Sequence, residues 1–131
     1  MTSMADIDDQ TVIAEVAAAF AGYERALMNY DPAALDEFFW RDERAIRFGV
    51  AENLYGHAAI AAYRRTRSSV PGRALANTRI TAIGRDAATV STEFTYPGDP
   101  RSGRQSQTWA RLPEGWRVIA AHVSFREEFE R

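Results

Sequence analysis

The chain changes character near its midpoint, and this change restricts the possible folds more than any other feature. Apolar residues recur at helical spacing up to Arg67, and the pattern stops in the serine, proline and glycine of Ser68–Gly72. Strand-like stretches joined by short turns follow. Helices first and hairpin-connected strands afterwards are typical of α+β folds. Three amphipathic helices need one shared apolar surface, so we predict a cone-shaped, curved antiparallel sheet wrapped over three N-terminal helices.

The helical half of the chain is expected to hold three helices and one strand. Apolar side chains between Asp8 and Tyr30 fall three or four residues apart and form one amphipathic stripe. Asp31 and Pro32 are residue types favoured at an N-cap and at the first helical position, so a second helix begins there. The expected helices are Asp8–Tyr30, Pro32–Trp40 and His57–Arg67, with a strand over Ala45–Val50 between the last two.

The second half of the chain is expected to hold four strands. Clusters of glycine, proline and aspartate separate its strand-like runs, and such clusters are typical of hairpin turns. No linker divides the sequence, so we expect residues 1–131 to form a single cone-fold domain. The strands are expected at Arg73–Ile83, Ala87–Tyr96, Gly103–Leu112 and Trp116–Phe125.

Composition excludes several classes of function. The 131 residues include no cysteine, which excludes disulfides and thiolate chemistry. The net charge of −2 is too small to indicate a nucleic-acid or membrane partner. No apolar run approaches the roughly 20 residues that span a bilayer, and the acidic N-terminus lacks the apolar segment of a secretory signal. We therefore expect a cytoplasmic protein.

The last strand is apolar on both faces, although the helices can cover only one face of a sheet. Strict alternation places Trp116 and Val118 on the face opposite to Ala121 and Val123. We expect the face of Trp116 to meet a second copy of the chain, with small residues of the preceding strand packing closely across it. The residues expected in this homodimer interface are Ser106, Thr108, Trp116, Val118, His122 and Ser124.

The order helix, helix, strand, helix and four strands resembles the nuclear transport factor 2-like superfamily, which includes SnoaL cyclases and ketosteroid isomerase. The runs RFGVAENLYG and GRQSQTWARLPEGWRVIAAHVS, with Ile60, Arg64 and Arg67, are similar to the AtzH/HpxZ-like family. This resemblance covers nearly the whole chain. It implies a place in ureide catabolism, in oxalurate breakdown or in cyanuric acid breakdown beside an amidase, without implying a particular reaction.

Three arginines are candidates for binding a small anionic ligand. Arg64 and Arg67 share a face of the third helix with apolar residues, so they either bend to solvent or enter the cone. Arg47 alternates with Ile46 and Phe48 on a strand. It points outward if those two residues are core, and into the cone if they face a dimer partner. The family resemblance favours the cone for Arg47.

Aromatic and amide side chains complete the expected ligand site. Tyr23 lies in the apolar stripe of the first helix and is either a core residue or a pocket wall, and Tyr55 has the same two interpretations. Gln107 and Trp109 share one face of their strand. If that face meets the helices, the Gln107 amide suits a urea or amide group and Trp109 forms a wall. A slip of one residue would reverse these faces.

The sequence holds no recognisable catalytic set. A base and oxyanion pair like that of ketosteroid isomerase cannot be mapped, and His122 and Ser124 have no third group to orient the histidine. His57 is expected at the surface, and we expect no metal and no cofactor. Two functions remain open. One is a dimer that binds a small carboxylated urea or amide and decarboxylates or hydrolyses it. The other is a non-catalytic accessory subunit of an amidase.

Overall fold

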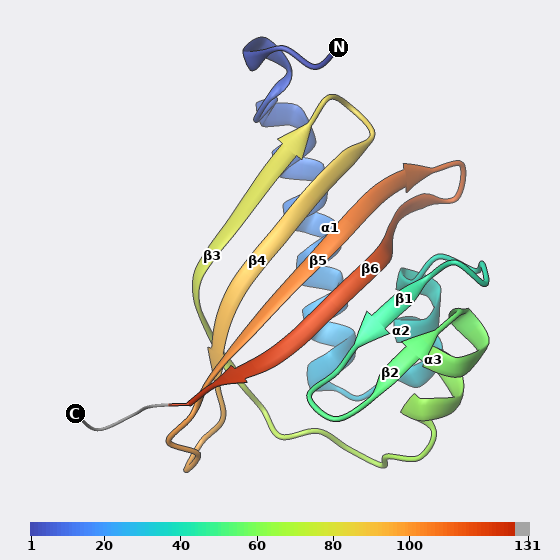
Figure 1. The fold of residues 1–131 in the computed structure, drawn as a ribbon, viewed down its shortest axis with the longest axis vertical. Helices are drawn as coiled ribbons and strands as arrows, with labels where there is room; N and C mark the ends of the chain where they lie inside the picture. The colour runs from blue at the N-terminus through green and yellow to red at the C-terminus, as the bar shows by residue number, and fades with distance from the viewer. Residues whose placement is uncertain (128–131) are drawn as a thin grey trace.

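The computed structural model describes residues 1–127 and confirms the α+β fold class (Figure 1). Every expected helix and strand is present, with ends within three residues of those expected, and two short elements are added. No helix in the described part is long and apolar enough to cross a membrane. The elements are η1 (Met4–Asp6), α1 (Gln10–Met28), α2 (Pro32–Phe38), β1 (Ile46–Phe48), β2 (Asn53–Tyr55), α3 (His57–Arg64), β3 (Ala74–Ile83), β4 (Ala87–Thr95), β5 (Ser102–Leu112) and β6 (Gly115–Arg126).

Local sequence explains where the helices begin. The Asp9 carboxylate accepts hydrogen bonds from two backbone N–H groups in the first turn of α1. Asp31 accepts from the N–H of Ala34 at the start of α2, and Pro32 lies in the first turn, where no N–H partner is needed. Gly56 precedes α3 with a φ of 90°, a conformation that residues with a side chain rarely adopt.

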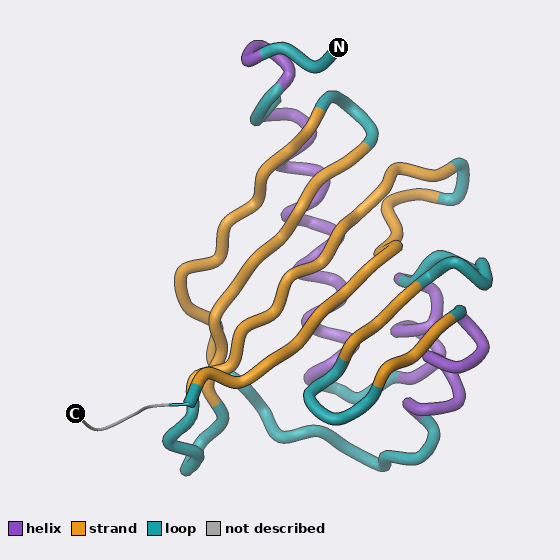
Figure 2. Tube along the Cα trace, in the orientation of Figure 1, coloured by secondary structure: helices purple, strands orange, loops and turns teal. Residues whose placement is uncertain are grey.

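One six-stranded sheet contains all the strands, in the order β2-β1-β6-β5-β4-β3 (Figure 2). The three long hairpin pairs between β3 and β6 are antiparallel, as expected. The departure is β1, which lies parallel to β6, with Arg47 opposite Ala121. No hairpin turn joins β1 to β6, because β2, α3 and three further strands lie between them in the sequence, so the pair is free to be parallel.

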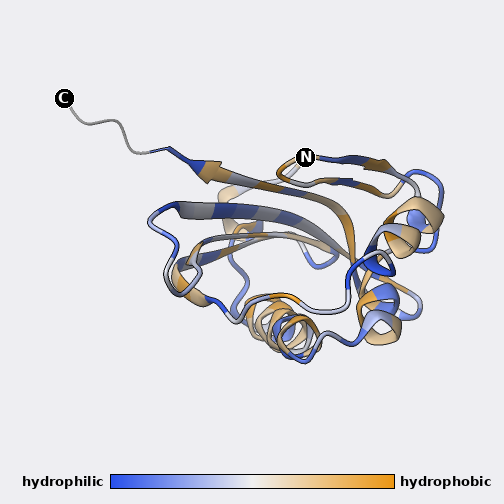
Figure 3. Cartoon of the chain, turned by 90° about the horizontal axis from the view of Figure 1, so that it is seen from below, coloured by the Kyte–Doolittle hydropathy of each residue, from blue (hydrophilic) through white to orange (hydrophobic). Residues whose placement is uncertain are grey.

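The helices cover one face of the curved sheet and leave the other face bare (Figure 3). The core lies between the two layers. From α1 it takes Val16 and Phe20, and from the sheet Val90, Trp109 and Val118, all of them buried. The layered arrangement follows from the single apolar stripe of each helix, since three such stripes share one sheet face.

A β-bulge in β6 changes which residues face the helices. Thr108 pairs with Ala120, but Trp109 pairs with Val118, so Ile119 is an extra residue between the two pairs. An extra residue in one strand reverses the alternation of side chains beyond it. The residues before the bulge therefore point to the opposite side from the one that strict alternation predicts.

The expected place of Trp116 and Val118 in a dimer interface is therefore wrong. Val118 is fully buried in the core, and Trp116 is buried with its Nε1 donating to Glu15 of α1 at 3.0 Å. Ala121, on the other side of the bulge, is buried in the same core. Apolar residues on both sides of the bulge in β6 therefore pack into the same core, between the sheet and the helices.

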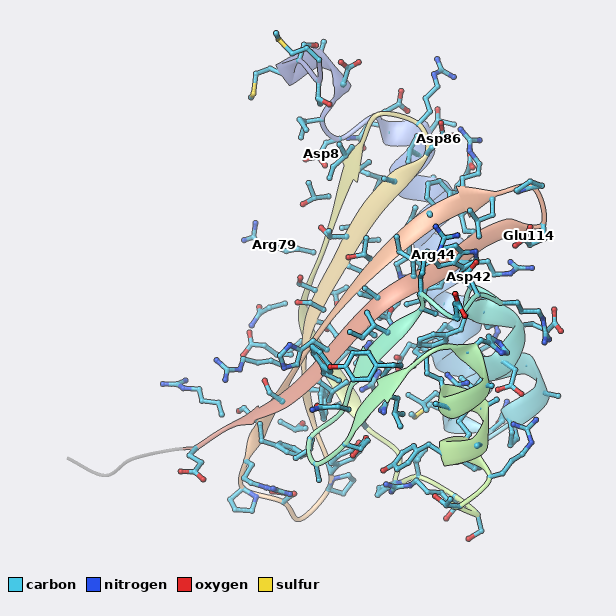
Figure 4. The ribbon with its side chains drawn as sticks, turned by 45° about the vertical axis from the view of Figure 1, so that its right-hand side comes forward. Asp8, Asp42, Arg44, Arg79, Asp86 and Glu114 are labelled. Atoms are coloured by element: carbon cyan, nitrogen blue, oxygen red, sulfur yellow. The ribbon has the colours of Figure 1, made fainter. Side chains whose placement is uncertain are left out.

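The turn before β1 joins the starts of β1 and α3. The carbonyl of Asp42 accepts from the backbone N–H groups of Ala45 and His57. Its carboxylate accepts from the side chain and the backbone N–H of Arg44, both at 2.8 Å, and these bonds lower the pKa of Asp42 to about 2 (Figure 4). The turn thereby fixes the position of Arg47, two residues beyond Ala45.

Candidate ligand-binding site

A cavity of about 720 Å³ opens beside the C-terminal half of α1. Its wall comes from α1, α3, the β1–β2 hairpin, the loop between α3 and β3, and the turn between β4 and β5. A volume of this size is typical of small-molecule sites. The polar part of the wall is rich in arginine: Arg47, Arg64, Arg67, Arg73 and Arg101.

Arg64 is the most unusual of these residues because it is buried, with only 8% of its surface exposed. Its Nη1 donates to Oδ1 of buried Asp36 at 2.9 Å, and its guanidinium lies 4.7 Å from the ring centre of Phe39. No described residue accepts from its Nε or Nη2, and both atoms keep some exposed surface. Because Arg64 lines the cavity, it offers spare N–H groups to a ligand there.

Asp36 holds two arginines at once. Its Oδ2 accepts from Arg65 at 2.7 Å, while its Oδ1 accepts from Arg64. Burial disfavours the charged carboxylate, but the hydrogen bonds from Arg65 and Arg64 outweigh that effect and lower the pKa of Asp36. Burial also lowers the pKa of Arg64, although arginine keeps its charge near neutral pH. The cluster therefore carries one more positive than negative charge.

Arg47 lies on the cavity wall, so the alternative that sends it into the cone agrees with the structure. Its neighbours Ile46 and Phe48 line a groove on the opposite face of the sheet. Arg47 Nη1 donates to Glu52 Oε1 at 2.9 Å, and the guanidinium lies 5.8 Å from the ring centre of Tyr63. A side chain at Gly49 would collide with the Glu52 carboxylate in its present position, so the carboxylate would have to shift beside Arg47.

Arg73 and Gln105 form a further part of the wall that was not expected from the sequence. Arg73 is held by the Glu24 carboxylate of α1, and its guanidinium lies 4.8 Å from the ring centre of Phe94. Its Nη1 donates to Gln105 Oε1 at 3.2 Å. Gln105 lies on the same face of β5 as Gln107 and Trp109, so strand alternation alone could have indicated it.

The charges around the cavity do not balance. Arg101 is paired with Asp99 at the rim, whereas no hydrogen bond or ion pair from the Arg67 side chain is found in the described part of the chain. Six arginines meet four carboxylates in this cluster, a surplus of two positive charges that favours an anionic ligand. The arginines are the five of the wall and Arg65, and the carboxylates are Glu24, Asp36, Glu52 and Asp99.

The cavity offers positioning groups and little acid–base chemistry. Among the lining residues the structure describes, the carboxylates are Glu52 and Asp99, and both are held in ion pairs. The two histidines lie elsewhere: His57 bonds the backbone carbonyl of Asp36, and His122 lies on the opposite sheet face. Residues 1–127 also hold no group of three or more histidine, cysteine or carboxylate side chains placed to bind a metal ion.

Of the residues expected in the ligand site, Tyr23, Arg47, Arg64 and Arg67 line the cavity and three others do not. Trp109 is fully buried in the core, and its Nε1 donates to Gln107 Oε1 at 3.1 Å. The amide of Gln107 is therefore bonded within the core. Gln107 lies two residues beyond Gln105 on β5 and so farther from the cavity. Tyr55 is 65% exposed and packs against Phe48 on the bare sheet face.

The bare face carries the remaining residues expected at the dimer interface. Ser106 and Thr108 line a groove of about 360 Å³ together with His122, and Ser124 follows His122 by two residues on β6. The Ser106 hydroxyl hydrogen-bonds that of Ser91 on β4 at 3.0 Å. An aromatic group borders the groove, with Phe48 packed edge-on against both Tyr55 and His122. No described element of the chain covers these side chains.

An open cone with a cavity between the sheet and the helices is the fold of nuclear transport factor 2-like proteins. Within it the chain belongs to the AtzH-like family, whose model matches residues 5–128. Family and fold support a protein that binds a small molecule. No protein among the curated sequences matches the chain.

Solved structures agree with this assignment. A protein of unknown function from Pectobacterium atrosepticum is 50% identical, with a TM-score of 0.94 over 97% of this chain and 100% of its own. A cystatin-like fold protein from Burkholderia xenovorans is 45% identical, with a TM-score of 0.90 over 94% of this chain and 98% of its own. A nuclear transport factor 2-like protein from Pseudomonas putida, 17% identical with a TM-score of 0.75 over 99% and 93%, shares the fold.

Proposed function

We propose that the protein is a cytoplasmic homodimer that binds a small carboxylated urea or amide in its cavity. The observation that carries the proposal is Arg64, a buried guanidinium with one N–H group on Asp36 and others left for the cavity. A buried positive charge with spare donors is suited to a carboxylate. Arg47 and Arg67 add positive charge on the same wall, and Tyr23 supplies an aromatic surface. The AtzH/HpxZ-like resemblance supports a ureide such as oxalurate.

Decarboxylation of a labile carboxyurea is the reaction that these groups favour over hydrolysis. Hydrolysis needs a base to activate water, and both lining carboxylates are held by arginines. Loss of carbon dioxide breaks the bond between carboxylate carbon and nitrogen and leaves the electron pair on a nitrogen, which takes up a proton. This step gains from orientation and from a fixed electrostatic environment more than from a base.

Binding of oxalurate and of neutral biuret, measured by titration calorimetry, tests the proposal. We expect oxalurate alone to bind, and Arg47→Met or Arg64→Met to weaken its binding at least about 10-fold, because a hydrogen bond to a charged group is worth about 1.5–3 kcal/mol. Arg79 provides the matched control, since it points away from the sheet edge in Figure 4 and Arg79→Met should leave binding unchanged. Equal binding of biuret, or no effect of either cavity variant, would contradict the proposal.

A second candidate is an accessory subunit of an amidase that acts on the same ureide. It is favoured by the position of both histidines outside the cavity. We propose that a second copy of the chain covers the bare face of the sheet through Ser106, Thr108, His122 and Ser124. Carbon dioxide release from a carboxyurea by the purified protein supports the enzyme. Ligand binding without turnover, joined to increased activity of an added amidase, supports the accessory subunit.

A further inference from the structure

Gln105 holds a hydrogen-bond donor that the protein itself does not use. The residue lines the cavity and is only 4% exposed. Its Oε1 accepts from Arg73 Nη1, whereas its Nε2 has no hydrogen-bond partner. Within residues 1–127 this is the single buried side-chain nitrogen or oxygen left in that condition. Nearly all buried polar groups in folded proteins are paired, so an unpaired donor at a cavity wall requires an explanation.

The orientation of this amide is fixed by its surroundings. Exchanging the oxygen and nitrogen of Gln105 would bring its NH₂ group against the donor of Arg73, so the oxygen must face the arginine. Arg73 is itself held by the Glu24 carboxylate, and its side chain is almost fully buried. Glu24 holds Arg73, and Arg73 holds the oxygen of Gln105. The NH₂ group of Gln105 therefore remains free to donate to a ligand.

Gln105 lies at the wall of the cavity and not in the centre of the core. Val123 lies opposite on β6 and also lines the cavity, as does Phe94 beneath Arg73. Gly103, the preceding residue on the same face of β5, has no room for a side chain because of the Phe94 ring. Gln107, the next glutamine on this face, differs because its oxygen is bonded to Trp109 in the core.

We propose that Gln105 Nε2 donates a hydrogen bond to an acyl oxygen of the bound ligand, which makes Gln105 a specificity-determining residue. This inference rests on the proposed function, in which the arginines hold a carboxylate. It adds that the ligand must also carry a urea or amide carbonyl. The Nε2 atom has almost no exposed surface, so side chains around it must shift as the oxygen approaches, an adjustment that is common on binding.

A pair of ligands with the same length and charge tests the assignment. N-carbamoylglycine carries a carboxylate and a urea carbonyl, and pentanoate carries the carboxylate alone. We expect the wild type to prefer N-carbamoylglycine by about 5- to 100-fold in Kd, the range for satisfying a buried donor. Gln105→Met removes the donor without adding charge and should remove this preference. Gln107→Met is the matched control, since it lies on the same strand face away from the cavity, and should retain it.

The outcomes separate the two claims. Binding of neither ligand by the wild type would overturn the proposed function and this assignment together. Binding with the same preference in Gln105→Met as in the wild type would overturn the assignment of Gln105 alone. If Gln105→Met does not fold, the side-chain NH₂ signals of Gln105 in the ¹⁵N-labelled wild type decide. Their protons should shift downfield with N-carbamoylglycine and not with pentanoate, and no shift at saturation would overturn the assignment.

Discussion

Replacing Asp36 with asparagine should cause a large loss of stability from one small change. Asp36 is 6% exposed, and its carboxylate supplies the negative charge beside the buried guanidinium of Arg64. Removing one partner of such a buried pair costs about 3–5 kcal/mol. Asparagine keeps the Oδ1 acceptor for Arg64, so we expect the lower end, about 3 kcal/mol. The contact with Arg65 adds nothing to this figure, since half of the Arg65 side chain is exposed.

Urea unfolding at pH 7 measures the effect of Asp36→Asn. With a slope of about 2 kcal/mol per molar urea, a loss of about 3 kcal/mol lowers the midpoint by about 1.5 M. Glu37→Gln is the matched control on the same helix. Glu37 pairs with Arg41, but both side chains are more than half exposed, and such pairs contribute at most about 1 kcal/mol. A midpoint of Asp36→Asn no lower than that of Glu37→Gln would refute the reasoning.

The same pair of variants gives a prediction for pH. The folded pKa of Asp36 lies below the unfolded value of about 3.9, so the unfolded chain binds the proton more readily. The stability that the carboxylate contributes is present above pH ~4 and is lost as the pH falls through the folded pKa. The gap between wild type and Asp36→Asn should therefore stay constant from pH 7 to pH 5 and narrow below pH 4. A gap that stays constant down to pH 2 would contradict this linkage.

Two further substitutions test the cavity wall and the outer face. Gly49→Ala should displace the Glu52 carboxylate, which orients the Arg47 guanidinium, and so weaken oxalurate binding while leaving the fold intact by circular dichroism; unchanged binding would show that the ion pair does not shape the site. Ser106→Arg places a long cation in the groove of the bare face and should convert a dimer to a monomer in sedimentation velocity, with Arg79→Glu on the edge strand as control. A dimer that survives Ser106→Arg would exclude this face as the interface.

Local patterns in the sequence were sufficient for the three α-helices and five of the six strands, but they did not indicate η1 or β2. Helix starts depend on single residues such as Asp31 and Pro32, and strand ends depend on turn residues, so neither requires long-range information. Arg47 shows the limit of such patterns. Alternation gave it two opposite positions, and the choice depended on which face of the sheet the helices cover. That is a tertiary fact, because β1 reaches its place only by pairing in parallel with β6.

The errors at Gln107 and Trp109 arise because side-chain alternation along a strand gives the face of a residue and not its distance from the cavity. One face of β5, the face toward the helices, carries Gln105, Gln107 and Trp109. Of these three, only Gln105 lies at the cavity. A bulge adds a second uncertainty, because Ile119 reverses the phase and no residue type in β6 marks it. Neither uncertainty affects Arg64, because it lies on a helix. A buried cation in an apolar helical stripe needs a counter-charge, which Asp36 provides. For this site, a charged residue within an apolar helical stripe was therefore a better indicator than a polar residue on the core-facing side of a strand.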